Sequence, residues 1–96
     1  MLARPEPGTK EDILLWLAGK DPNEKYDWSN CSACACGQYS SARLGTSTAW
    51  LGAQRYIPAL HELNRLACDV PSRSFGELHA IARGTWDAQQ PTAAAT

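Results

Sequence analysis

The clearest helical pattern in the chain is PALHELNRLAC, which runs from Pro58 to Cys68. Proline is favoured in the first turn of a helix, because its missing N–H would be unpaired there in any case. Apolar side chains then recur three and four positions apart, which places them on one face of a helix. The dipeptide Val70-Pro71 follows, and we expect it to end this helix. The apolar face consists of Leu60, Leu63 and Ala67, with Ala59 and Leu66 beside them.

Helices are also expected near the two ends of the chain. Thr9 can accept a hydrogen bond from the amide three residues on, and the helix that it begins is expected to end at Gly19. Towards the C-terminus, Ser74 and Glu77 have the spacing of a capping box, which predicts the start of the last helix. Gly84 is expected to end or loosen that helix. Its buried positions are expected to be Phe75, Leu78, Ile81 and Ala82.

The middle of the chain predicts one helix rich in small residues and one short helix. The first is expected from Cys31 to Arg43, with Asn30 as its N-cap. The short one falls within residues 46–54. No run of β-branched residues alternates at the period of two that indicates a strand. We therefore predict an all-α, compact single domain of about four main helices with one short or interrupted helix. The small-residue helix is expected to bury Cys31, Ala35, Tyr39 and Ala42 on one face.

The length of 96 residues suits one domain, because two would each bury too little surface. We expect a flexible lead-in over residues 1–8, a helical domain over 9–88 and a disordered tail over 89–96. The start of the chain lacks the apolar segment of a signal peptide, and no stretch approaches the roughly 20 apolar residues that span a membrane. The sequence therefore predicts a cytoplasmic protein that does not bind membranes.

The charge of the chain argues against two classes of partner. A dedicated nucleic-acid binder carries a basic excess and a DNA mimic an acidic one, whereas the net charge here is −1. Between Asp27 and Glu62 the chain has no acidic residue and only two basic ones, Arg43 and Arg55. Two arginines supply too few phosphate contacts for tight binding. We do not expect direct nucleic-acid binding.

The four cysteines are the most unusual feature of the composition. Cys31, Cys34 and Cys36 are close in sequence, and a structural zinc site requires a fourth ligand. That ligand could be Cys68, or else His61 or His79. A Cys-x-x-Cys pair is the usual first half of such a site. The second half normally comes from another close pair, which this chain lacks. A small structural zinc module is therefore an alternative interpretation.

Two further interpretations concern reactive and buried thiols. The segment from Trp28 to Cys34 is similar to a thioredoxin-type site, but the apolar strand that this fold needs before it is missing. No histidine and acid have a recognisable catalytic spacing, so we expect no enzyme, and a thiol-active redox protein remains the third alternative. Free cysteine is among the most buried residue types. We favour small, buried cysteines and expect no cofactor.

Aromatic side chains near the expected loops are the candidates for a contact surface. A large aromatic residue in such a position either covers the core or anchors a partner. Trp28, Trp50 and Tyr56 belong to this class, and Arg43 and Arg55 lie in the same acid-free stretch. We predict that these five residues bind a protein partner.

Three short segments carry a family resemblance. CACGQY (Cys34–Tyr39), LNRLA (Leu63–Ala67) and SFGELHAIAR (Ser74–Arg83) resemble small proteins of bacteriophages and proteobacterial prophages, over residues 26–88. Such proteins have no agreed activity, and many small phage proteins act by binding and blocking a host machine, the anti-CRISPR proteins above all. The resemblance implies a non-enzymatic inhibitor of a host complex such as CRISPR–Cas, working in the host cytoplasm.

Overall fold

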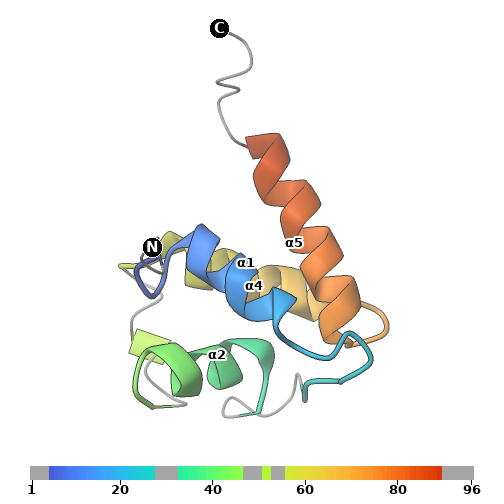
Figure 1. Cartoon of the computed structure of the whole chain (residues 1–96), viewed down its shortest axis with the longest axis horizontal. Helices are drawn as coiled ribbons and strands as arrows, with labels where there is room; N and C mark the ends of the chain where they lie inside the picture. Colours follow the sequence, from blue (N-terminus) through green and yellow to red (C-terminus); the bar gives the residue numbers. More distant parts are fainter. Residues whose placement is uncertain (1–4, 28–32, 47–50, 53–55, 90–96) are drawn as a thin grey trace, which may run out of the picture.

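The computed structural model describes residues 5–27, 33–46, 51–52 and 56–89. These residues form an all-α domain without a strand, which confirms the predicted fold class (Figure 1). Leu51 and Gly52 are helical and lie inside the short helix expected at 46–54, most of which is outside the described ranges. None of the described helices is long and apolar enough to cross a membrane. The main helices are α1 (Lys10–Ala18), α2 (Ala35–Arg43), α4 (Pro58–Asp69) and α5 (Phe75–Gln89).

Helices α1, α4 and α5 begin where their local signals predict. The Thr9 hydroxyl accepts from the Asp12 amide at 3.1 Å, and Pro58 lies in the first turn of α4. The Ser74 hydroxyl accepts from the Glu77 amide at 3.4 Å, as half of a capping box. Helix α5 then continues through Gly84 to Gln89, so Gly84 does not end it.

Helix α2 differs from its prediction at its start and on its buried face. Cys34 is the N-cap with an extended backbone, and its sulfur accepts from the Gly37 amide at 3.3 Å, so the helix begins at Ala35 and not at Cys31. Asn30 and Cys31 lie outside the described residues. Ala42 is exposed, because the buried face is turned towards Cys36, which packs against α4. The buried residues of α2 are Ala35, Cys36, Gly37, Tyr39 and Ser40.

The core lies around α4, which packs against both α2 and α5, while α1 packs against α5. In Figure 1, α2 and the C-terminal end of α5 lie on opposite sides of α1 and α4. Glu62 joins three of the helices, because it accepts from Trp86 Nε1 at 3.1 Å and pairs with Lys10 Nζ at 3.5 Å. The largest fully buried side chains are Trp86, Tyr39, Phe75, Ile13, Leu17, Leu60, Leu63 and Leu78.

The loop between α1 and α2 is fastened to the start of α5. The Phe75 amide donates to the Glu24 carbonyl at 2.9 Å, and the Gly76 amide donates to the Pro22 carbonyl at 3.0 Å. Lys25 and Ser74 form an isolated antiparallel bridge. Gly76 is required here, because a Cβ at this position would lie 2.7 Å from Pro22 Cβ and 2.8 Å from the Pro22 carbonyl oxygen.

Candidate functional site

A buried carboxylate stands at the centre of the main polar network. Asp12 is fully buried in the first turn of α1. Its Oδ2 atom accepts from the Tyr39 hydroxyl at 2.6 Å and from Arg43 Nε at 3.0 Å, and both donors come from α2. A buried carboxylate is costly unless it is paired and hydrogen-bonded, and these contacts supply both. The network therefore fixes α1 against α2.

The N-terminal segment joins the same network. The Gly8 amide donates to the Tyr39 hydroxyl at 2.6 Å, and Arg43 Nη2 donates to the Pro5 carbonyl at 3.3 Å. Gly8 is buried with φ of +89°, and a Cβ there would lie 3.0 Å from Ile57 Cδ1. Residues 5–8, which the sequence predicts to be part of a lead-in, thus lie against α2 and the start of α4.

Tyrosine ionisation is suppressed inside this network. Burial and the hydrogen bond to Asp12 raise the pKa of Tyr39 well above its ordinary value of 10.0. Its hydroxyl is therefore neutral at physiological pH and can donate to the carboxylate while accepting from Gly8. In a second buried position, the Tyr26 hydroxyl donates to the Ala67 carbonyl at 2.6 Å, and burial raises the pKa of Tyr26 to about 12.

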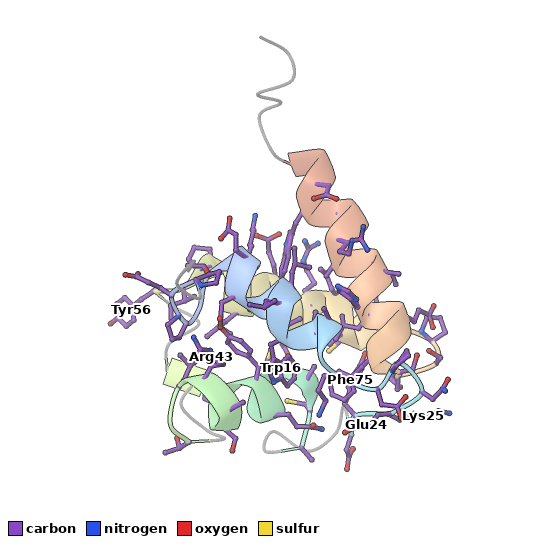
Figure 2. All side chains as sticks on the ribbon, viewed as in Figure 1. Trp16, Glu24, Lys25, Arg43, Tyr56 and Phe75 are labelled. Carbon is purple, nitrogen blue, oxygen red and sulfur yellow. The ribbon has the colours of Figure 1, made fainter. Side chains whose placement is uncertain are left out.

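Two of the five predicted contact residues lie within the described structure. Tyr56 is 84% exposed and directly precedes Ile57, the N-cap of α4. The Arg43 side chain is 25% exposed and is bonded to Asp12 and Pro5. Both side chains lie towards the same end of the molecule in Figure 2. Trp28, Trp50 and Arg55 lie outside the described residues. Leu51, which is 41% exposed, belongs to the same connection between α2 and α4.

The described cysteines have different surroundings. Cys34 and Cys36 are buried, as the packing interpretation expects, whereas Cys68 is exposed. The Cys36 thiol donates to the Leu60 carbonyl at 3.6 Å. Burial, with smaller contributions from Cys34 and Cys68, raises the pKa of Cys36 well above its ordinary value of 9.0. Cys36 is therefore a poor nucleophile.

Among the residues that the structure describes, no group of three or more histidine, cysteine, aspartate or glutamate side chains could hold a metal ion. Cys31 lies outside these residues. His61 is exposed on α4 and His79 is half-buried on α5. Partial burial, with a smaller effect of Arg83, lowers the pKa of His79.

An aromatic cluster packs against Tyr39, a member of the polar network. Trp16 makes edge-to-face contacts with Tyr39 at 5.5 Å and with Phe75 at 5.6 Å between ring centroids. Lys20 Nζ lies 4.8 Å from the centre of the Phe75 ring and donates to Gln38 Oε1 at 3.3 Å. Trp16 is partly buried and packs against the core. The sequence pattern reveals neither the Lys20 contacts nor the buried Asp12, which reads as an ordinary acid in a first turn.

Comparison with protein families, with curated proteins and with solved structures finds no match to this chain. The resemblance to phage proteins therefore stays a prediction.

Proposed function

We propose that this chain is a non-enzymatic binding protein that blocks a host complex by occupying part of its surface. The observation that carries the proposal is Tyr56, whose side chain is 84% exposed at the junction between the α2–α4 connection and α4. An aromatic ring contributes a large contact area at a low cost in conformational entropy, and tyrosine is enriched among the residues that dominate binding energies. Tyr56 is the proposed anchor.

The charge and shape of the described surface support binding in preference to catalysis. No pocket is found among the described residues. The carboxylate of Asp12 is fully buried, together with Tyr39 and Gly8 of the same network. The stretch that carries Tyr56 has no acidic residue between Asp27 and Glu62, so it opposes the approach of an acidic partner less than the flanking segments do.

The partner class comes from the family resemblance. Small phage proteins without catalytic motifs often inactivate a host defence complex by covering a working surface. We propose a CRISPR–Cas effector protein as the target and the host cytoplasm as the place of action. Trp28, Trp50 and Arg55 complete the proposed contact surface, together with Tyr56 and the exposed part of Arg43.

An interference assay tests this function. The chain is expressed in a CRISPR-bearing host that is challenged with a targeted plasmid, and plasmid survival is counted. We expect the wild-type chain to restore survival and Tyr56→Ala to weaken binding to the purified effector roughly 30-fold or more, as at a binding hot spot. Leu15→Ala is the matched control, because Leu15 is an exposed apolar side chain on α1, 49% exposed. It should behave as wild type.

The assay can fail in two distinct ways. Full immunity in the presence of the wild-type chain, together with no binding to purified effector complexes, removes the inhibitor proposal. Inhibition that survives Tyr56→Ala unchanged leaves an inhibitor but removes Tyr56 as its anchor.

A further inference from the structure

Residues 5–8, here called the N-terminal strap, lie across the polar network and are held to it at two points. One is the 2.6 Å bond from the Gly8 amide to the Tyr39 hydroxyl, and the other is the 3.3 Å bond from Arg43 Nη2 to the Pro5 carbonyl. Thr9, the N-cap of α1, follows the strap, and its amide and hydroxyl both donate to the Glu6 carbonyl. Among the four residues of the strap only Gly8 is buried.

The strap covers groups that the rest of the fold holds in place without it. Arg43 Nε is bonded to Asp12 at 3.0 Å, so the guanidinium keeps its position when Nη2 is released. The Tyr39 hydroxyl likewise keeps its bond to Asp12. The side chain of Ile57 packs on Gly8. Ile57 is the residue that follows the exposed Tyr56. Opening of the strap therefore uncovers a donor, Arg43 Nη2, and an acceptor, the Tyr39 hydroxyl. It also uncovers the apolar side chain of Ile57, the neighbour of Tyr56 in sequence.

We propose that the strap opens independently of the four helices and that its opening exposes a binding site for a peptide backbone. Segments with few buried contacts open at a small fraction of the cost of global unfolding, and the strap has two hydrogen bonds to α2, two short-range ones from Thr9 and one buried residue. A partner segment with a carbonyl and an N–H spaced like those of Pro5 and Gly8 replaces the strap on Arg43 and Tyr39. Only the identity of the occupant rests on the proposed function, because opening is a property of the chain alone.

Native-state hydrogen exchange measures the opening directly. The Gly8 amide reports on the strap and the Leu63 amide, inside α4, reports on global unfolding. We expect the protection factor of Gly8 to be roughly 100-fold or more below that of Leu63 and to change little with added urea. Equal protection of the two amides with equal dependence on urea overturns the proposal, because the strap would then open only when the domain unfolds.

Two buried tyrosines provide a matched pair of variants. Tyr39→Phe removes the acceptor of the Gly8 amide and should speed exchange at Gly8 about tenfold relative to Leu63. Tyr26→Phe removes a different buried hydroxyl, which donates to Ala67, and should leave exchange at Gly8 as it is in the wild type. If both variants accelerate Gly8 and Leu63 equally, the strap does not open independently.

Two glycines with positive φ provide a test that keeps the buried hydroxyls. Gly8→Ala introduces a strained backbone at φ +89° and a Cβ 3.0 Å from Ile57, so the strap should be displaced and the Thr9 amide should exchange at least about tenfold faster. Gly45→Ala carries similar strain at φ +100° with no atom within 4 Å, and should leave Thr9 unchanged. Unchanged exchange at Thr9 in Gly8→Ala overturns the proposal.

Binding measurements distinguish a failure of the strap proposal from a failure of the proposed function. With a purified effector that binds the wild-type chain, Gly8→Ala should bind faster than wild type, and slower association overturns the role of the strap as a cover. Fast exchange at Gly8 without binding to any effector retains the opening and removes the proposed partner. If the chain inhibits the effector but the strap opens only on global unfolding, the proposed function stands and the strap proposal is overturned.

Discussion

At the scale of single residues, the structure gives two side chains roles that their sequence context does not indicate. Asp12 stands in the first turn of α1, where an acid usually serves the helix dipole in solvent, yet it is fully buried. Arg43 was predicted from the acid-free stretch to face a partner, and its guanidinium is bonded to Asp12 and Pro5. Neither role could be predicted from local pattern, because the Asp12–Arg43 pair spans 31 positions of the chain.

Asp12→Asn should destabilise the domain by about 2–4 kcal/mol, because it leaves Arg43 without its carboxylate partner in a partly buried place. Urea denaturation with a fluorescence signal gives the free energy of unfolding. Asp87→Asn on the exposed side of α5 is the control, and should change it by less than about 0.5 kcal/mol. A loss as small as that of the control would show that the Asp12 network contributes nothing net.

Thiol labelling should distinguish the cysteines by burial. Cys68 is exposed and should react with iodoacetamide in the native protein, whereas Cys36, buried and with a raised pKa, should react only after unfolding. Timed alkylation followed by peptide mass spectrometry gives both rates, and a sample in denaturing urea is the control in which the two rates converge. Native labelling of Cys36 as fast as that of Cys68 would revive the thiol-active alternative.

At the scale of helices, the sequence predicts well wherever the signal is local. The starts of α1 and α4 follow from a capping threonine and a first-turn proline, and both signals act within one turn. The start of α2 was misplaced because small residues set a weak pattern and because a cysteine sulfur, not an asparagine, caps it. Of the two outcomes expected at Gly84, the end of the helix is ruled out, since glycine weakens a helix interior by only about 1 kcal/mol and the buried Trp86 follows it.

Two glycines of α5 should respond oppositely to alanine. Gly76→Ala places a Cβ 2.7 Å from Pro22 Cβ and 2.8 Å from its carbonyl oxygen, which should cost about 1–3 kcal/mol of stability. Gly84→Ala meets no atom within 4 Å and should stabilise the domain by roughly 0.5–1 kcal/mol. Thermal unfolding of the two variants beside the wild type tests the pair. If Gly76→Ala leaves the stability unchanged, the loop that carries Pro22 can shift to make room for the added Cβ at little cost.

At the scale of the whole molecule, the core depends on three groups that must keep their protons. Tyr26, Tyr39 and Cys36 all have pKa values raised by burial. Because the folded state holds these protons more tightly than the unfolded chain, their stabilisation is complete below the unfolded values of 9.0 for Cys36 and 10.0 for the tyrosines. It is lost as pH rises through the folded values.

The free energy of unfolding should therefore fall above about pH 9, with each group adding up to about 1.4 kcal/mol per pH unit once its unfolded form ionises. Urea titrations at neutral pH and at a series of alkaline pH values measure this slope. Tyr26→Phe should make the slope shallower between pH 10 and about 12, the folded pKa of Tyr26. A flat profile across this range contradicts the burial of these three groups.

The Asp12 network also offers a way to recognise distant relatives. Its three side chains are spaced along the chain as an aspartate, a tyrosine 27 positions later and an arginine 31 positions after the aspartate. Substitution of any one leaves the others with unmet charge or hydrogen bonds, so descendants of a common ancestor should keep or change the three together. Gly76 should persist with them, because the Cβ and the backbone of Pro22 leave no room for a side chain there, while Gly84 is free to change. A homologue could thus be identified by this sparse signature after the rest of its sequence has diverged.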